Sequence, residues 1–307
     1  MKVFIIGEGM LETRASGDAA FAYGGDALNT AVYMARAGLP PQFVSAVGMD
    51  ANSDALLAAW RGEAVGLDHL LRHPTRLAGR YIIAINDQGE RSFSYERDKS
   101  AARAFFQIEG WRQAFDAAAA EADLLYLTGI TLSIFAAQER ALLEDLAAKV
   151  RARGGEVAFD PNYRPRGWPS TAAARDAVER FAGHTSIALP SIDDHVALFG
   201  EETPVEAAQR WRRLGAAEVV VKLGAEGTYV VAGETAAFVG AAKPARVADT
   251  TAAGDSFNAA YLTARLLGRA SPVEAAAAGA SLAAEVIGWP GAIAPDHVGR
   301  APQTPGK

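Results

Sequence analysis

The chain places Asp249-Thr250-Thr251-Ala252-Ala253-Gly254-Asp255-Ser256-Phe257-Asn258 where a loop runs into a helix. The small residues before Asp255 allow the backbone to approach a ligand closely, and a helical pattern starts at Phe257. The free N–H groups and the dipole of a helix N-terminus attract anions. An acid at such a place is best explained if it accepts a proton from a hydroxyl that attacks a phosphoryl group. The stretch therefore predicts phosphoryl transfer with Asp255 as the base, although Asp255 could instead only cap the helix.

The rest of the chain alternates short apolar segments with helical patterns, and no repeat or linker interrupts it. The apolar segments are continuous, as is typical of strands buried on both faces of a parallel sheet. This alternation predicts an α/β fold with a doubly wound, mostly parallel sheet and right-handed crossovers. We expect strands at Val3–Ile6, Phe43–Val47, Leu124–Leu127, Val157–Phe159, Ile187–Leu189 and Val219–Val221, and helices at Ala27–Ala37, Gln138–Arg153, Val205–Leu214 and Phe257–Leu267.

Two segments, residues 12–23 and 79–97, carry shorter strands that alternate apolar and polar residues. The sequence Asn86-Asp87-Gln88-Gly89 is typical of a hairpin turn between two strands. A small β-hairpin inserted in an α/β domain suits a lid that closes over a ligand, although it could be an ordinary surface hairpin. We therefore expect residues 1–307 to form a single domain with these lid segments inserted.

The composition excludes several classes of protein and site. The net charge of −6, with basic residues scattered along the chain, argues against a partner held through nucleic-acid phosphates. The chain has no cysteine, so disulfides and thiolate metal sites are impossible. The apolar run within Met1–Gly7 is too short for a signal peptide, and Ala275–Ala284 is too short to span a membrane. We expect a soluble, cytoplasmic protein.

Two common nucleotide-binding motifs are absent from the sequence. The turn Gly7-Glu8-Gly9-Met10-Leu11-Glu12 follows a strand, but Glu12 takes the place of the third glycine of a dinucleotide fingerprint and no helical pattern follows. The chain also has no Walker-type phosphate loop. A nucleotide must therefore bind elsewhere.

Four motifs, in order along the chain, resemble those of the ribokinase-like (PfkB) carbohydrate kinases. They are Gly24–Arg36, Arg91–Arg97, Phe159–Trp168 and Asp249–Phe257. The last resembles the family signature D-T-x-G-A-G-D, with Ala252 where most members have glycine, and alanine still provides a backbone N–H. The resemblance extends from about Val3 to Ala294 and is closest to the bacterial branch that phosphorylates 2-keto-3-deoxygluconate.

The resemblance implies roles for the residues around Asp255. Asp255 would take the proton of the attacking hydroxyl, and the backbone N–H groups of Ala252, Ala253 and Gly254 would hold the charge that develops on the phosphoryl group. The resemblance also implies ATP as the phosphoryl donor, together with Mg²⁺ to neutralise phosphate charge.

The nucleotide would be held by a K-x-G-x-x-G segment that follows the predicted strand Val219–Val221. The residues that the resemblance assigns to the nucleotide are Lys222, Gly224, Ala225, Glu226, Gly227, Asn162 and Gly254. Lys222 could meet a phosphate as a point charge, or it could be a solvated lysine at the end of a strand.

The substrate would lie between the glycine turn at Gly24-Gly25, after which we expect Asp26 to cap a helix, and the lid. The resemblance assigns substrate contacts to Gly25, Asn29, Tyr81, Tyr95, Arg97, Arg164 and Asp255. A guanidinium fork is the best partner for a sugar carboxylate. Arg97 has no acidic neighbour on its strand except Glu96, which points to the opposite face. Arg164 follows a predicted strand and would face either the sugar carboxylate or the transferred phosphoryl group.

The sequence defines the metal ligands less sharply. The family often has an N-x-x-E motif where this chain has Ser191-Ile192-Asp193-Asp194. Asp194 could bind a metal through water, or Asp193 and Asp194 could only begin a helix. The resemblance also implies a monovalent cation near Asp249.

The sequence thus predicts a cytoplasmic, homo-oligomeric kinase that uses ATP to phosphorylate the terminal hydroxyl of 2-keto-3-deoxy-D-gluconate, giving the 6-phosphate. A fructokinase or another sugar kinase of the same fold is the nearest alternative, and Arg97 argues against it. A non-catalytic sugar-binding regulator is an alternative of another class, and an intact Asp255 argues against that one.

Overall fold

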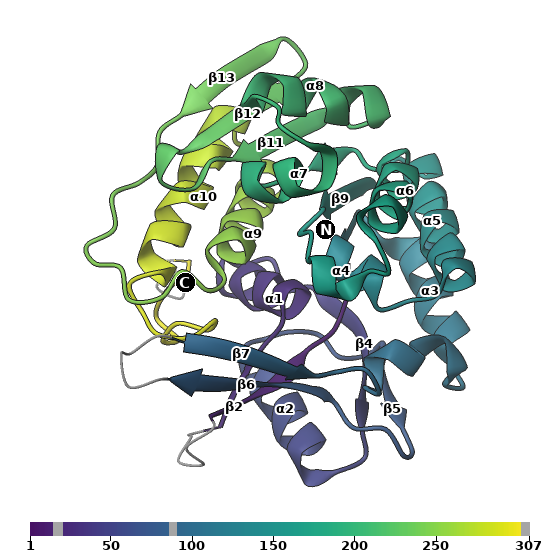
Figure 1. The fold of residues 1–307 in the computed structure, drawn as a ribbon. Coiled ribbons are helices and arrows are strands. Elements are labelled where there is room, and N and C mark those ends of the chain that lie inside the picture. Colours follow the sequence, from purple (N-terminus) through teal and green to yellow (C-terminus); the bar gives the residue numbers. More distant parts are fainter. Residues whose placement is uncertain (15–20, 86–90, 302–307) are drawn as a thin grey trace, which may run out of the picture.

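The structure, a computed structural model, describes residues 1–14, 21–85 and 91–301 and contains a large and a small sheet (Figure 1). The large sheet has nine strands among these residues, in the order β13-β12-β11-β10-β9-β8-β1-β4-β5. Neighbours from β11 to β5 are parallel, whereas β12 and β13 are antiparallel additions at one edge. The bounds are β1 Val3–Ile6, β4 Gln42–Gly48, β5 Leu70–His73, β8 Leu124–Thr128, β9 Glu156–Asp160, β10 Ile187–Ala188, β11 Glu218–Lys222, β12 Thr228–Ala232 and β13 Thr235–Val239. The predicted doubly wound, mostly parallel sheet is confirmed.

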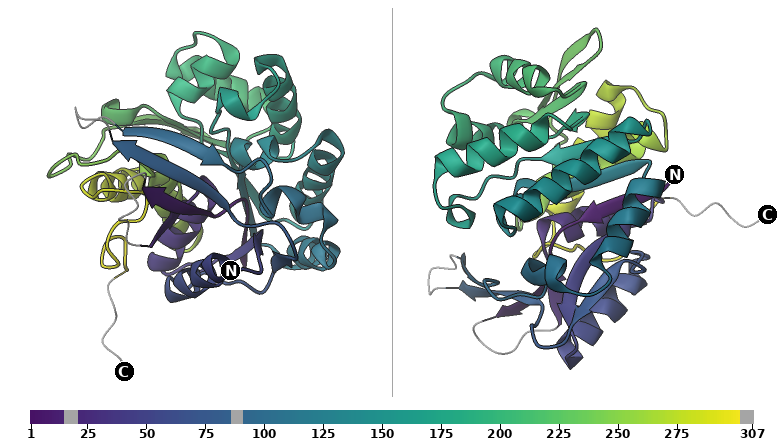
Figure 2. Two further views of the ribbon diagram at one scale, coloured as in Figure 1. Left: turned by 60° about the horizontal axis from the view of Figure 1, so that its bottom comes forward. Right: turned by 90° about the vertical axis from the view of Figure 1, so that its right-hand side faces the viewer.

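Helices cover both faces of the large sheet (Figure 2). Because its central strands are buried on both sides, they need continuous apolar runs. One face carries α1 (Asp26–Arg36), α2 (Ala51–Gly62), α9 (Ala253–Leu266) and α10 (Pro272–Val286), and the other carries η1 (Ala102–Gln107), α3 (Trp111–Glu121), α4 (Gly129–Ser133), α5 (Ala137–Ala152), α6 (Thr171–Ala182), α7 (Ile192–Phe199) and α8 (Pro204–Leu214). The short 3₁₀ helices η2 (Pro165–Gly167) and η3 (Gly224–Glu226) lie in loops. None of the helices in the described part of the chain has both the length and the apolar composition that a membrane span requires.

The strand order reverses beside β1. The chain passes from β1 to β4 and β5 on one side, then returns to β8 and continues through β9, β10 and β11 on the other. In doubly wound sheets, ligands bind outside the carboxyl ends of the strands at such a reversal. The candidate site is therefore expected where β1, β8 and β9 end.

The small sheet has four strands among the described residues, in the order β3 (Ala22–Gly24), β2 (Met10–Arg14), β6 (Gly79–Ile85) and β7 (Arg91–Glu96). Strands β6 and β7 form the expected antiparallel hairpin, to which β2 adds in parallel and β3 adds antiparallel to β2. The hairpin is thus part of a larger sheet, because the first predicted lid segment supplies two more strands. The predicted turn at residues 86–89 lies outside the described residues. Figure 1 shows the small sheet below α1.

Candidate active site

Helix α9 begins at Ala253, four residues before the predicted start at Phe257. The prediction relied on the spacing of large apolar side chains, of which Phe257 is the first. The residues of the first turn, Ala253 to Ser256, are small or polar and therefore gave no such signal. The N-cap is Ala252, which adopts a left-handed conformation with φ 64° and ψ 12°. Asp255 therefore lies within the first helical turn, and the alternative that it caps the helix is wrong.

Asp255 is a buried carboxyl group, only 9% exposed. Burial raises its pKa to about 7, and the nearby carboxylate of Asp26 adds to the increase. The side-chain amide of Asn29 opposes this shift by donating a hydrogen bond of 2.8 Å to Asp255 Oδ2. A carboxylate with a pKa near neutrality is well matched to accepting a proton from a hydroxyl. Asn29, predicted to contact the substrate, thus also contacts the predicted base.

The backbone at the start of α9 offers N–H groups, but not all three of those predicted. The N–H of Ala253 donates to the Thr250 carbonyl at 3.2 Å. Within the described residues, the N–H groups of Ala252 and Gly254 have no hydrogen-bond acceptor. Two N–H groups are therefore open for an anion, and that of Ala253 is already engaged in a turn.

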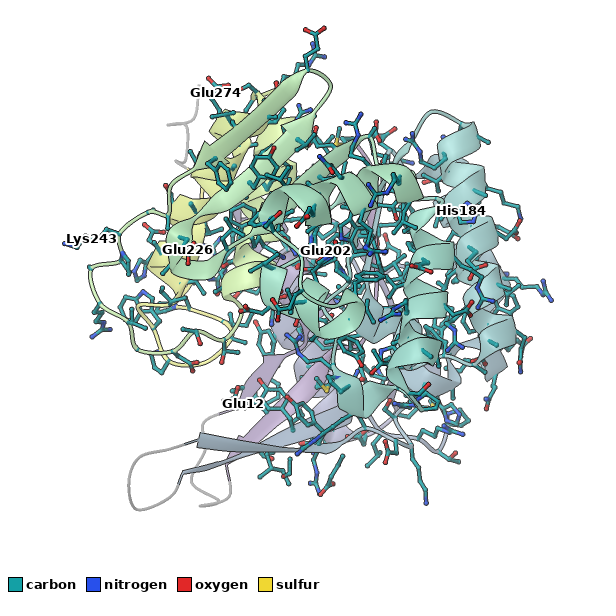
Figure 3. All side chains as sticks on the ribbon, turned by 45° about the horizontal axis from the view of Figure 1, so that its top comes forward. Glu12, His184, Glu202, Glu226, Lys243 and Glu274 are labelled. Carbon is teal, nitrogen blue, oxygen red and sulfur yellow. The ribbon has the colours of Figure 1, made fainter. Side chains whose placement is uncertain are left out.

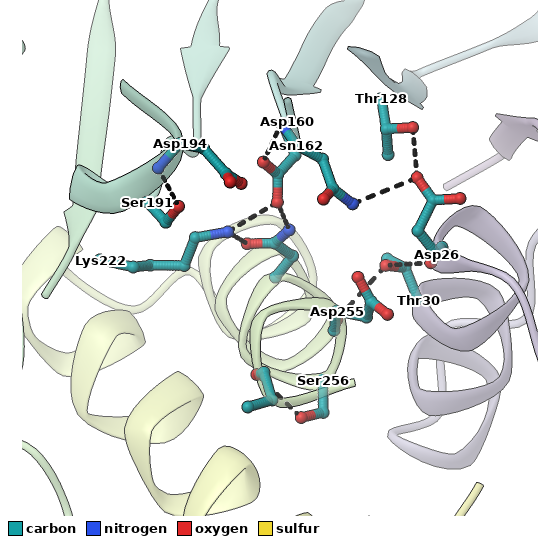
Figure 4. Close-up of polar contacts among 12 residues, drawn as sticks. Asp26, Thr30, Thr128, Asp160, Asn162, Ser191, Asp194, Lys222, Asp255 and Ser256 are labelled. Atoms are coloured by element: carbon teal, nitrogen blue, oxygen red, sulfur yellow. Dashed lines mark hydrogen bonds and ion pairs between the residues drawn. The ribbon is translucent and has the colours of Figure 1, made fainter. Parts of the chain in front are cut away.

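Lys222 ends strand β11 and points toward the first turn of α9 (Figure 4). Its Nζ lies 2.6 Å from Asp160 Oδ2 and 3.0 Å from Asn258 Oδ1, and its side chain is only 11% exposed. A Cβ added to Gly254 would lie 3.6 Å from this ammonium group. The alternative of a solvated lysine at a strand end is therefore wrong.

The other residues of the predicted nucleotide loop form a tight, exposed turn between β11 and β12. Gly224 and Gly227 have positive φ angles of 58° and 108°, and Leu223 N–H closes the turn on the Gly227 carbonyl at 2.8 Å. Ala225 and Glu226 lie on its surface, as Figure 3 shows for Glu226. A Cβ on Gly227 would approach the Val239 carbonyl to 2.1 Å, so packing against β13 by itself requires this glycine.

Two carboxylates of the site, the half-buried Asp26 and the buried Asp160, were not predicted to act there. Asp26 was expected to cap α1, but the N-cap is Gly25, and Asp26 instead accepts hydrogen bonds from the hydroxyl of Thr128 and from Asn162 Nδ2 at 3.3 Å. Burial raises the pKa of Asp26. Asn162, predicted to contact the nucleotide, thus faces the start of α1.

Asp160 is the second unpredicted carboxylate, at the carboxyl end of β9. Besides Lys222, it accepts hydrogen bonds from Asn258 Nδ2 at 2.6 Å and from the N–H of Asn162 at 3.0 Å. Its position at a strand end beside the strand-order reversal is the signal that could have identified it. Figure 4 shows Asp26, Asp160 and Asp255 around one space, with the ammonium of Lys222 at its edge.

Arg164 and Asp194 form an ion pair, with Arg164 Nη1 2.7 Å from Asp194 Oδ1. Helix α7 begins at Ile192, and its N-cap Ser191 accepts a hydrogen bond from the Asp194 N–H. Asp193 and Asp194 thus lie in the first turn of this helix, and the role of Asp194 toward a metal stays a prediction. Among the described residues, no group of three or more His, Cys, Asp or Glu side chains could hold a metal ion.

The predicted substrate tyrosines face each other on the small sheet. Tyr81 of β6 pairs with Tyr95 of β7, and their ring centroids are 6.3 Å apart. Tyr81 is buried and donates to Glu12 Oε2 at 2.6 Å, whereas Tyr95 is 52% exposed. Gly25 has a φ of 132°, and a Cβ there would lie 2.3 Å from the carbonyl oxygen of Glu8, so only glycine fits.

Arg97 directly follows β7 and has an acidic partner that the sequence did not reveal. Its Nη2 lies 2.5 Å from Oε2 of Glu8, a residue of the turn after β1. Glu96 points away from this pair and binds Arg80 at 2.6 Å, as the strand alternation predicted. Glu8 had been considered only as part of a failed dinucleotide motif, because its partner is distant in sequence.

Comparison with known proteins agrees with this geometry. Residues 10–298 match the pfkB family carbohydrate kinases. The chain is 41% identical over 302 residues to the 2-dehydro-3-deoxygluconokinase of Escherichia coli, covering 96% of this chain and 97% of that protein. The PfkB protein from a Polaromonas species has a TM-score of 0.80 at 30% identity, covering 92% of this chain and 94% of that one. Fructokinase with bound ATP from Xylella fastidiosa has a TM-score of 0.80 at 21% identity, with coverage of 95% and 93%, and shares the fold.

The family match covers the small sheet and every strand of the large sheet except β1, and it includes Asp255, Lys222 and Arg97 but not Glu8. A buried acid at the start of a helix, open backbone N–H groups and an adjacent lysine are what transfer of a phosphoryl group to a sugar hydroxyl requires. Sequence, fold and site together place this chain in the pfkB family of carbohydrate kinases.

Proposed function

We propose that this protein uses ATP to phosphorylate the terminal hydroxyl of 2-keto-3-deoxy-D-gluconate, giving the 6-phosphate. The observation that carries the proposal is the buried carboxyl group of Asp255 beside the open N–H groups of Ala252 and Gly254. The relative from Escherichia coli, named 2-dehydro-3-deoxygluconokinase, supports the choice of substrate.

In this reaction Asp255 takes the proton of the attacking hydroxyl. The hydroxyl oxygen forms a bond to the γ-phosphorus of ATP while the bond to the leaving ADP oxygen breaks. The N–H groups of Ala252 and Gly254 and the ammonium of Lys222 stabilise the charge on the transferred group. Asp160 and Asn258 hold Lys222 in place through their contacts with Nζ.

Magnesium would enter as part of the MgATP substrate. Mg²⁺ keeps several waters and usually binds proteins through one or two carboxylates besides the substrate phosphates. In the described part of the chain, no group of three or more His, Cys, Asp or Glu side chains is placed to hold a metal ion, and Mg²⁺ bound with the phosphates of ATP needs no such group. We propose Asp194 as a carboxylate that reaches the metal through water, which requires its ion pair with Arg164 to open. Arg164 would then be free to meet the phosphoryl group or the sugar carboxylate.

The nucleotide is proposed to lie over Lys222 and the exposed turn at residues 224–227, with Asn162 at the border of its phosphates. The substrate is proposed to contact Gly25, Asn29, Tyr81, Tyr95 and Arg97. In this arrangement the small sheet acts as a lid over the sugar, and the whole chain is one kinase domain.

The proposal also includes a monovalent cation near Asp249, a homo-oligomeric assembly and a cytoplasmic location. The carboxylate of Asp249 accepts hydrogen bonds from the Thr251 N–H and hydroxyl and from the Gly291 N–H, at 2.7–3.0 Å. It can therefore order the two loops around such an ion. A comparison of turnover in potassium and in tetramethylammonium chloride at equal ionic strength tests the cation.

A coupled assay of ADP release tests the function with ketodeoxygluconate, gluconate, fructose and ribose as acceptors. We expect the first to have the highest kcat/KM and the Asp255→Asn variant to be strongly impaired on every acceptor that the unchanged enzyme uses. Preference for fructose would favour a fructokinase. ADP release with none of them, despite sugar binding, would favour a non-catalytic regulator.

A further inference from the structure

The ion pair of Glu8 and Arg97 joins two places where the chain crosses between the large and the small sheet. Glu8 lies between β1 and β2, and Arg97 directly follows β7. The two side chains are 1% and 16% exposed. A buried ion pair is weak evidence for stability, since the loss of hydration offsets much of the attraction. Its position at the root of the proposed lid points to a role in binding.

The hydrogen bonds of this pair are incomplete. Within the described residues, both carboxylate oxygens of Glu8 and the Nε and Nη2 atoms of Arg97 are buried without a hydrogen bond of good geometry. A bidentate fork between the same groups would have satisfied two donors of the guanidinium. Glu8 therefore attracts Arg97 by charge without satisfying the hydrogen-bonding capacity of its guanidinium group.

The carboxylate of Glu8 fits a space that a glycine provides. A Cβ added to Gly79, the first residue of β6, would lie 2.6 Å from Glu8 Oε1. Two residues further along this strand, Tyr81 binds Glu12, which Figure 3 shows on the small sheet. Glu8 is thus fixed between the end of β1 and the start of β6.

Arg97 has a choice between two carboxylates. Burial opposes its charge, but Glu8 first and Asp26 second more than offset this and raise the pKa of Arg97. Asp26 borders the phosphoryl end of the site, beside Thr128 and Asn162.

We propose that Glu8 is a positioning residue that sets the preference for sugar acids, because it holds the guanidinium of Arg97 where a substrate carboxylate can reach its remaining donors. The inference rests on the proposed function. Glu8 itself does not touch the substrate, and Gly79 contributes by leaving room for its carboxylate.

The first test replaces Glu8 by Gln, which keeps the shape but removes the charge. The KM for ketodeoxygluconate should rise by about 10-fold, the effect of losing one charge-assisted hydrogen bond. The kcat, the KM for ATP and the KM for fructose should stay close to those of the unchanged enzyme. A residue that only supports the fold would instead alter the kinetics of both sugars together.

The second test displaces Glu8 without removing any charge. Gly79→Ala should raise the KM for the acid in the same selective way, and should add little to Glu8→Gln because both changes act through one contact. Gly62→Ala is the matched control, since a Cβ at Gly62 meets nothing within 4 Å.

The outcomes separate the inference from the function on which it rests. If the unchanged enzyme phosphorylates ketodeoxygluconate but both Glu8→Gln and Gly79→Ala leave its KM unaltered, the role of Glu8 is wrong and the function stands. Additive effects of the two substitutions would also overturn the role of Glu8. If the unchanged enzyme uses only neutral sugars, both proposals fall together.

Discussion

The two ends of the proposed substrate site are built in different ways. At the phosphoryl end, Asp255 is a buried acid with two other carboxylates nearby, and Lys222 offsets only part of their repulsion. At the sugar-acid end, Arg97 is a half-buried cation with a buried carboxylate partner, Glu8. The first arrangement raises the pKa of an acid and so prepares it to accept a proton. In the second, Glu8 neutralises the charge of Arg97, and we propose that a substrate carboxylate competes for it, so that this end selects the substrate and takes no part in the chemical step.

Removing the acid at the phosphoryl end should have the largest effect. Asp255→Asn keeps the size of the side chain, and no helix cap is lost because Ala252 occupies the N-cap. We expect kcat to fall by roughly 10²–10⁴, the usual range for loss of a general base. ATP affinity, measured by calorimetry, should remain near that of the unchanged enzyme. If kcat of this variant stayed within a few-fold of that of the unchanged enzyme, Asp255 would not be the general base.

Removing the guanidinium group of Arg97 at the sugar-acid end should have a smaller and more selective effect. Arg97→Ala should lower kcat/KM for ketodeoxygluconate, and the loss should correspond to about 2–4 kcal/mol of activation free energy. The reason is that the substrate carboxylate loses a charge-assisted partner. Activity on fructose should scarcely change, and Arg97→Lys should recover only part of the loss. Equal proportional losses on the acid and on fructose would contradict the role assigned to Arg97.

The same contrast explains what the sequence could predict. The phosphoryl end is largely local, so Asp255 and the N–H groups beside it could be located from ten consecutive residues, as could the alternation of strands and helices that forms the large sheet. The local pattern missed the early start of α9 and the engaged N–H of Ala253. It also missed Asp26 and Asp160, which reach the site from distant segments.

The sugar-acid end depends on pairs between distant segments. Glu8 meets Arg97 only after the two sheets have packed together. No short-range pattern encodes such contacts. The glycines at positions 25 and 79 were visible in the sequence, but their reason, the close approach of Glu8, was not.

Filling the anion site should test the backbone contribution at the phosphoryl end. Gly254→Val would put a branched side chain beside the ammonium of Lys222, where the phosphoryl group is proposed to lie. We expect kcat to fall by about 10²-fold, as for the loss of one donor to a developing anion. The thermal unfolding midpoint checks that the fold is kept. Normal kinetics would place the phosphate elsewhere.

The raised pKa of Asp255 predicts two opposite dependences on pH. Because the base must be ionised to act, kcat/KM should fall about tenfold for each pH unit below 7. Because the native state holds this proton at pH values where the unfolded chain has released it, the free energy of unfolding should decrease as pH rises from about 4 to about 7. Asp255→Asn should remove that part of the decrease in denaturant titrations. A rate that is flat down to pH 5 would contradict the raised pKa.

The smallest effect is expected where the chain departs from the family signature. Ala252 has a φ of 64°, a left-handed conformation that disfavours a Cβ by about 1–2 kcal/mol. Glycine would relieve this backbone strain. It would also stabilise the unfolded state by about 0.4–1 kcal/mol, because glycine raises the conformational entropy of the unfolded chain. Ala252→Gly should therefore stabilise the protein by less than about 1 kcal/mol in urea unfolding. Its kinetics should be unchanged, since the backbone N–H remains. Ala253→Gly is the matched control: this first residue of α9 has no positive φ, so glycine relieves no strain there and should not stabilise the protein. A marked loss of kcat in Ala252→Gly, with the control active, would show that the methyl group of Ala252 itself shapes the anion site.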